Sequence, residues 1–88
     1  GPSAGAAITL TMIAGVLNKT PNTKILITGT IESDGSIGRI GGVQEKAGAA
    51  IESGATIFLV PFGQKVDPGG IEVAEVKKIQ EVVNLVLK

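Results

Sequence analysis

Residues 24–46 read KILITGTIESDGSIGRIGGVQEK, and this stretch decides the fold. Its β-branched beginning predicts a strand over residues 24–31. The dipeptide Asp34-Gly35 is a strong signal for a hairpin turn, so the chain is expected to return as a short strand over residues 37–40. A helix is then expected over residues 43–53, and it ends where a glycine takes the C-cap position.

Another helix is expected before this stretch. Residues 4–17, AGAAITLTMIAGVL, carry no charge, and their apolar side chains recur at helical spacing. The segment is shorter than the roughly 20 residues that cross a bilayer, so we expect a buried helix. The order α-β-β-α-β-β-α predicts an α+β fold with a mixed β-sheet packed against helices. The elements expected after the central stretch are a buried strand at 56–60, a loop at 61–70, an edge strand at 71–76 and an amphipathic helix at 77–87.

The composition excludes several classes of protein. The 88 residues suffice for one small domain or part of one, and eight basic residues balance eight acidic ones. A net charge of zero gives no long-range attraction to nucleic acid, so we expect no nucleic-acid partner. Because the chain has neither cysteine nor histidine, disulfides, thiolate nucleophiles and the usual zinc sites are excluded. The lack of cysteine also fits a cytoplasmic location.

Ser3 is the candidate nucleophile. It lies in the motif GPSAG, directly before the uncharged helix, among residues with little or no side chain. A substrate carbonyl could approach its hydroxyl, and free amides at the helix N-terminus could hold a developing oxyanion. The alternative is an ordinary helix N-cap, in which the Ser3 hydroxyl accepts a hydrogen bond from the amide of Ala6.

A serine hydroxyl needs a base, and without histidine the choices in this chain are a carboxylate or a neutral lysine. Lys46 is the candidate, because its neighbours one turn away on the helix offer no countercharge and little cover. Glu45 is adjacent in sequence but points to another side of the helix. The alternative is a surface lysine that keeps its ammonium group in water. The neighbours on the face of Lys46 are Gly42, Val43, Ala49 and Ala50.

Several segments occur together in one order: GPSAG, then TG followed by a polar hairpin and IGG, then VQEK, GATIFLVP and VAEVKKIQEVVNLVL. They resemble the proteolytic domain of the Lon protease family over essentially the whole chain. The resemblance implies a serine endopeptidase that hydrolyses peptide bonds in proteins with a Ser-Lys dyad. Ser3 would be the nucleophile, Lys46 its base, and Thr28 in the TG motif would help to orient the lysine amine. From the residues alone, Thr28 could equally be an ordinary strand threonine.

The resemblance also implies partners. Residues 1–88 correspond to the C-terminal half of a Lon-type proteolytic domain, so the chain is interpreted as a fragment whose upstream half is a partner. Protein or peptide substrates are expected, and relatives assemble into hexameric rings, which predicts a homo-oligomer. No cofactor is expected in the chain, and ATP would act only through a separate ATPase module. The chain departs from the family at Thr30, where relatives have glutamate, and in the short loop at 61–70.

Three functions stay open at this point. The first is a Lon-type serine peptidase with an active dyad. The second is a Lon-like domain that is inactive in isolation, because its dyad is misaligned without substrate or oligomer. The third is a non-enzymatic α/β interaction module, in which Ser3 is only a cap and Lys46 is only a solvated surface residue.

Overall fold

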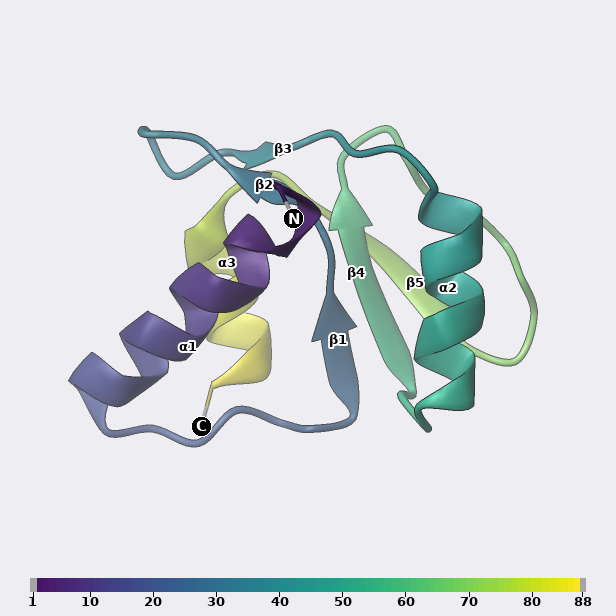
Figure 1. Ribbon diagram of the computed structural model, residues 1–88. Coiled ribbons are helices and arrows are strands. Elements are labelled where there is room, and N and C mark those ends of the chain that lie inside the picture. Colours follow the sequence, from purple (N-terminus) through teal and green to yellow (C-terminus); the bar gives the residue numbers. More distant parts are fainter. Residues whose placement is uncertain (1, 88) are drawn as a thin grey trace.

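The computed structural model describes residues 2–87 and confirms the α+β class (Figure 1). A three-stranded parallel sheet in the order β1-β4-β5 lies beside a separate antiparallel pair, β2-β3. Parallel and antiparallel strands are thus both present, as predicted, but in two sheets. The elements are η1 (Pro2–Ala4), α1 (Gly5–Leu17), β1 (Ile25–Ile27), β2 (Thr30–Ile31), β3 (Ile37–Gly38), α2 (Val43–Glu52), β4 (Ile57–Pro61), β5 (Glu72–Val76) and α3 (Ile79–Val86).

The central strand β4 divides the interior into two hydrophobic cores. Leu59 faces one core, which α1 and α3 complete, whereas Phe58 and Val60 face the other, which α2 completes. This follows from the alternation of side chains along a strand, and it explains why β4 is apolar at every position. Strand β5 lies at the edge of the sheet, as its alternating sequence predicts.

The predicted strand over residues 24–31 is wrong in one respect, because the chain breaks into β1 and β2 after Ile27. Gly29 has φ +146°, and its amide and carbonyl bond to Ser3 and Ala6 instead of to a neighbouring strand. A side chain at Gly29 would place its Cβ 2.5 Å from Ile37 Cγ2, so glycine is required there. The break turns the chain toward the start of α1.

The hairpin at Asp34-Gly35 is confirmed. Strands β2 and β3 pair with Ile31 opposite Ile37, and the Ser36 amide donates to Asp34 Oδ1 at 2.9 Å, which closes the turn. The hairpin is fastened to the start of α3, since Ile37 donates its amide to Lys77 O at 2.8 Å. An ion pair of 3.4 Å between Lys78 Nζ and Asp34 Oδ2 adds a second connection.

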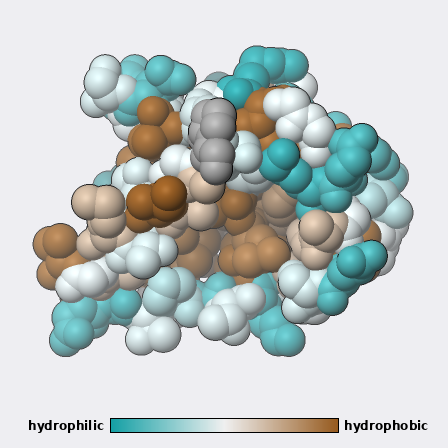
Figure 2. Space-filling model, viewed as in Figure 1, coloured by the Kyte–Doolittle hydropathy of each residue, from teal (hydrophilic) through white to brown (hydrophobic). Residues whose placement is uncertain are grey.

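Helix α1 forms where it was predicted, but the expectation that it is buried is wrong. Ala6, Leu10 and Ala14 face the core with α3, whereas Met12 and Val16 are 67% and 85% exposed. The alanines Ala6 and Ala14 let the buried face of α1 pack closely against the core. No element of residues 2–87 covers the opposite face of the helix. Figure 2 shows apolar side chains exposed along this helix. No helix in the described part of the chain has the length and hydropathy needed to cross a membrane.

The loop of residues 62–71 joins two parallel strands, β4 and β5, without the helix that such a connection usually contains. Val66 and Ile71 of this loop pack against the core under α2. The loop therefore covers part of the same face of the sheet that α2 covers.

Candidate active site

Ser3 lies in the 3-10 turn η1, immediately before α1, and is half-buried. The amide of Ala6 donates to Gly29 O at 3.0 Å, and the N-cap of α1 is Ala4, without a side-chain hydrogen bond. The alternative in which Ser3 caps the helix through Ala6 is therefore wrong, and the Ala6 amide is not free for an oxyanion. Gly1 of the GPSAG motif lies outside the described residues.

The end of β1 fixes the backbone of Ser3. The Gly29 amide donates to Ser3 O at 3.1 Å, and the Thr28 amide donates to Leu59 O at 3.0 Å. Gly5 allows the start of α1 to lie close to β2, because a Cβ at this position would lie only 3.2 Å from the Ile31 amide nitrogen. The nucleophile candidate is thus bonded through its main chain to the residue that follows Thr28.

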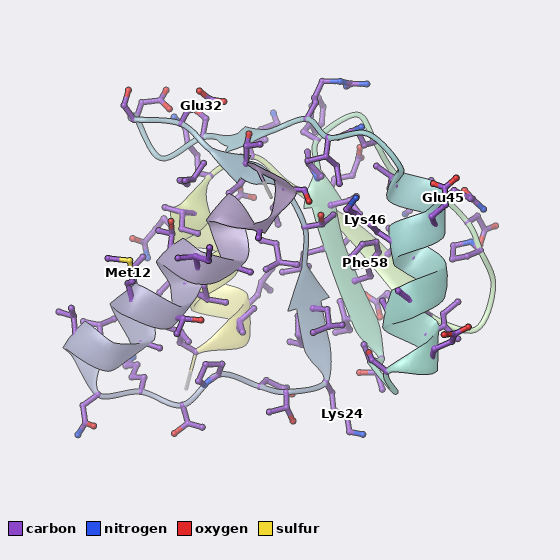
Figure 3. All side chains as sticks on the ribbon, viewed as in Figure 1. Met12, Lys24, Glu32, Glu45, Lys46 and Phe58 are labelled. Carbon is purple, nitrogen blue, oxygen red and sulfur yellow. The ribbon has the colours of Figure 1, made fainter. Side chains whose placement is uncertain are left out.

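Lys46 extends from the first turns of α2 toward the sheet, and Glu45 leaves the same turn of the helix in another direction (Figure 3). The lysine is partly buried, and its Nζ donates to the carbonyl of Gly41 at 3.3 Å. Glu45 Oε2 and Lys46 Nζ lie near the same backbone position, within 3.4 and 3.6 Å of where a Cβ at Gly42 would be, but they form no ion pair in the described residues. The structure thus gives the amine a backbone acceptor instead of a carboxylate partner.

Thr28 and Lys46 line one cavity of about 230 Å³ between β1, β4 and α2. Thr28 is 5% exposed, and the other lining side chains are apolar. The apolar lining residues are Leu26, Ile27, Ala49, Ala50 and Phe58.

The structure thus places Thr28 and Lys46 on one cavity and joins the backbone of Ser3 to Gly29, the residue after Thr28. Within residues 2–87, neither the Ser3 hydroxyl nor the Thr28 hydroxyl forms a hydrogen bond with the Lys46 amine, which bonds to Gly41 O. Catalytic hydrogen bonds are often long or open in structures without substrate.

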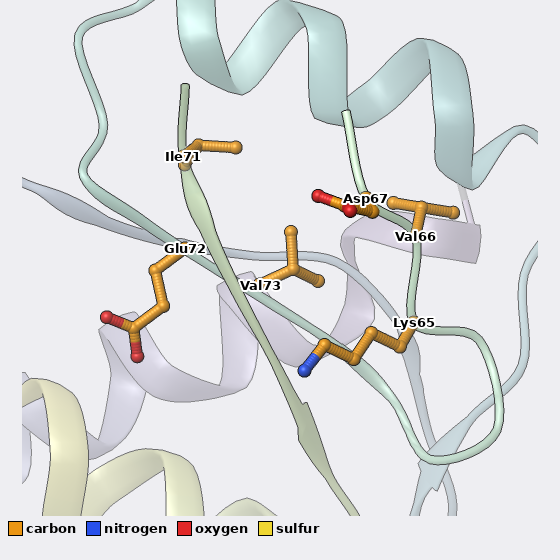
Figure 4. A pocket seen from close by; sticks show the side chains of 6 residues that line it. All are labelled: Lys65, Val66, Asp67, Ile71, Glu72 and Val73. Carbon is orange, nitrogen blue, oxygen red and sulfur yellow. The ribbon is translucent and has the colours of Figure 1, made fainter. Parts of the chain in front are cut away.

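A larger cavity, of about 580 Å³, lies elsewhere, between β5 and the loop of residues 62–71 (Figure 4). Exposed Lys65, Asp67 and Glu72 contribute its charges, and it shares no lining residue with the cavity of Lys46. None of its lining residues has a hydroxyl or thiol that could attack a carbonyl. Its size alone does not make it the active site.

Two features of the site were missed from the sequence. The carbonyl of Gly41 holds the lysine amine, and Gln64 makes two hydrogen bonds with the backbone of Ile40, next to Gly41. The bond between Lys46 and Gly41 could have been predicted, because a lysine that follows a glycine pair at a helix start lies near free backbone carbonyls. The pairing of Gln64 with Ile40 leaves no signal in the sequence, because the two residues are far apart in sequence and belong to different segments.

The family model described as "Lon protease (S16) C-terminal proteolytic domain" matches residues 1–88. The chain belongs to this family, as its motifs predicted.

Individual relatives agree with this assignment. The chain is 33% identical to the Lon protease of Buchnera aphidicola subsp. Acyrthosiphon pisum, with 100% of this chain and 12% of the relative aligned. It is 36% identical to the archaeal Lon protease of Methanocaldococcus jannaschii, with 98% of this chain and 14% of the relative aligned. It is 35% identical to the Lon protease of Trichlorobacter lovleyi, with 100% and 12% aligned. The chain thus spans a small part of each relative's length.

Proposed function

We propose that this chain supplies the nucleophile and the general base of a serine endopeptidase, with Ser3 and Lys46 in these roles. The observation that supports the proposal is that Thr28 and Gly29, adjacent residues after β1, each connect to one of the two residues. Ser3 bonds to Gly29 through its backbone, and Thr28, the residue before Gly29, shares an apolar cavity with Lys46. Membership of a protease family supports peptide bonds in proteins as the substrate.

In the proposed mechanism, neutral Lys46 takes the proton of the Ser3 hydroxyl while Ser3 Oγ attacks the peptide carbonyl carbon. The tetrahedral intermediate collapses, the C–N bond breaks, and the lysine returns the proton to the leaving amine. Water then attacks the acyl-enzyme ester, again with Lys46 as the base, and releases a carboxylic acid product and free Ser3. The hydrogen bond from Nζ to Gly41 O uses one N–H of the amine and leaves its lone pair for the serine proton.

A second candidate function is a Lon-like domain that is inactive until substrate or assembly closes the dyad. The contact between Lys46 Nζ and Gly41 O favours this candidate, because in the described residues the amine bonds to a carbonyl and not to Ser3. The two candidates differ in one measurable property, which is the reactivity of Ser3 toward a small electrophile without bound peptide.

Labelling with a fluorophosphonate, together with cleavage of an unstructured protein substrate, tests both candidates in the protein at its full natural length. Ser3→Ala should abolish labelling and cleavage. Lys46→Met should reduce both rates by about 10²- to 10⁴-fold, the usual contribution of a general base. Lys65→Met, which removes an exposed lysine from the loop of residues 62–71, is the matched control and should retain full activity.

The results separate the open functions. Labelling of Ser3 without peptide supports the constitutively active peptidase, whereas labelling that appears only after substrate is added supports the conditional dyad. Cleavage that persists in both Ser3→Ala and Lys46→Met would disprove the dyad. An absence of cleavage and labelling under every condition would leave the interaction module as the function.

A further inference from the structure

We infer that Gln64 is a positioning residue for the lysine of the proposed dyad, and that it acts through the backbone of Ile40 and Gly41. The inference rests on the proposed function, since it assigns a role in placing the base. Gln64 lies in the loop after β4, its side-chain amide bonds to the backbone of Ile40, and it is not among the residues that line the cavity of Lys46. Its effect on the lysine must therefore pass through the main chain.

The side-chain amide of Gln64 pairs with both polar groups of Ile40. Gln64 Nε2 donates to Ile40 O at 2.7 Å, and the Ile40 amide donates to Gln64 Oε1 at 2.9 Å. Both bonds are partly buried, so water replaces them less readily than bonds at the surface. The glutamine amide occupies the place that a neighbouring strand would take beside Ile40.

Gln64 is itself held in place by the end of β4. The backbone amide of Gln64 donates to Pro61 O at 3.1 Å. The backbone amide of the preceding residue, Gly63, donates to the side-chain carboxylate of Glu75 in β5. The pairing with Ile40 thus connects the segment before α2 to the edge of the three-stranded sheet. A firm anchor is necessary if Gln64 is to restrict its partner.

The residues that follow Ile40 hold Lys46. Gly41 O accepts the hydrogen bond from Lys46 Nζ at 3.3 Å, and Gly42 O accepts the one from the Lys46 amide at 3.0 Å. Gly42 has φ +70°, and a Cβ at Gly41 would touch nothing within 4 Å. Because glycine has no Cβ, the Gly41-Gly42 pair could adopt many backbone conformations. The Gln64 pairing beside them limits where the Gly41 carbonyl, and hence the lysine amine, can lie.

A positioning role predicts a specific kinetic effect. If Gln64 fixes the amine, its loss should reduce the rate of the chemical step, since the base is misplaced for part of the time. It should leave the binding of substrate unchanged, because Gln64 does not line the cavity beside the dyad. A merely structural role would instead lower the amount of folded protein and leave the rate per folded molecule the same.

The test uses Gln64→Met and Gln64→Glu in the protein at its full natural length, with Gln44→Met on the exposed side of α2 as the control. Methionine keeps the length of the side chain without its hydrogen bonds. Glutamate keeps the acceptor for the Ile40 amide but turns an oxygen toward Ile40 O. We expect kcat and the fluorophosphonate rate to fall about tenfold in both variants, the equivalent of one or two hydrogen bonds, with KM within about twofold. Gln44→Met should change none of these quantities.

NMR on the same variants reports the contact without relying on peptidase activity. Hydrogen exchange of the Ile40 amide should accelerate about tenfold or more in Gln64→Met, and the ε-methylene signals of Lys46 should shift. Unchanged Lys46 signals, or a kcat equal to that of Gln44→Met, would overturn the inference. If Ser3→Ala and Lys46→Met retained cleavage, the dyad would be disproved, while the NMR result would still decide whether Gln64 positions the lysine. Gln64→Asn, which keeps the amide, provides the same readouts should methionine prevent folding.

Discussion

The carbonyl oxygen of Ser3 accepts a hydrogen bond of 3.1 Å from the amide of Gly29. The carbonyl of Gly29 in turn accepts a hydrogen bond of 3.0 Å from the amide of Ala6. Gly29 therefore bonds both to the residue before the start of α1 and to the first turn of that helix. The position of the proposed nucleophile is therefore set by a residue of the sheet region and not by a side-chain cap. Changes at Gly29 should act on Ser3 and on the fold together.

Gly29→Ala should destabilise the fold strongly. An L-residue at φ +146° is strained by about 1–3 kcal/mol, and the new Cβ would overlap Ile37 Cγ2 at 2.5 Å. Urea unfolding followed by circular dichroism measures the loss, and fluorophosphonate labelling at low temperature reports whether the remaining folded protein still presents Ser3. A variant as stable as the wild type would show that the backbone at Gly29 relaxes freely.

The matched control is Gly48→Ala, on the exposed side of α2. A Cβ at Gly48 would meet nothing within 4 Å, and alanine is favoured over glycine in a helix interior. This substitution should increase the free energy of unfolding by about 0.5–1 kcal/mol. Opposite signs at the two glycines would separate the special requirement at Gly29 from any general effect of adding a methyl group.

Thr28→Val should lower activity without unfolding the protein. Valine has nearly the size of threonine, so packing beside β4 persists, but Thr28, which lines the cavity of Lys46, loses its hydroxyl. If that hydroxyl helps to orient the amine, kcat should fall about tenfold, because a hydrogen bond to a functional group contributes on the order of 1 kcal/mol. Steady-state cleavage of a peptide measures the change. Thr28→Ser, which keeps the hydroxyl, should recover most of the rate, whereas equal rates in all three proteins would identify Thr28 as an ordinary strand residue.

Elements with local signals could be predicted from the sequence. The turn at Asp34-Gly35 is closed by a contact within the turn itself, and the apolar pattern of α3 reports its one buried face. The break between β1 and β2 could not be predicted, because β-branched residues continue through it and its cause is the bond between Gly29 and Ser3, which are distant in sequence. The exposed face of α1 was missed since hydrophobicity does not reveal which side of a helix is covered.

The candidate site divides in the same way. The residue types of Ser3, Thr28 and Lys46 were recognisable, because each lies in a short motif. The shared cavity of Thr28 and Lys46 depends on the parallel pairing of β1 with β4, which brings α2 beside Thr28. The link from Gln64 to Ile40 depends on the path of a loop, for which no sequence periodicity exists.

Asp34 should make the fold sensitive to acid. Its pKa is lowered from 3.8 to about 2, first because the Ser36 amide donates to its carboxylate, then because of the Ser36 hydroxyl and Lys78. Since the pKa is lower in the folded state, the charged carboxylate stabilises the fold above about pH 4, and this contribution disappears as the pH falls toward 2. Urea midpoints from pH 6 down to pH 2, compared between the wild type and Asp34→Asn, measure the difference.

The asparagine variant isolates the charge, because its Oδ1 can still accept the Ser36 amide. The wild type should be more stable than Asp34→Asn at pH 6, and the two should converge near pH 2. Asp67→Asn removes an exposed carboxylate from the loop of residues 62–71 and controls for the change in net charge. A gap between wild type and Asp34→Asn that stays constant from pH 6 to pH 2 would contradict the lowered pKa.

Phe58→Leu and Leu59→Ala should separate activity from stability, because these neighbours face opposite cores. Leu59 is 1% exposed and lies with α1 and α3, so its truncation should cost about 2–5 kcal/mol while each folded molecule keeps its kcat. Phe58 lines the cavity of Lys46, and a smaller side chain there enlarges the cavity and gives the lysine side chain room to leave the position that the dyad requires. Phe58→Leu should therefore cost no more than about 1.5 kcal/mol but lower kcat severalfold. Unfolding free energies and kcat, measured on both variants, check the contrast. Equal losses of kcat per folded molecule would mean that the two faces of β4 do not act independently on the site.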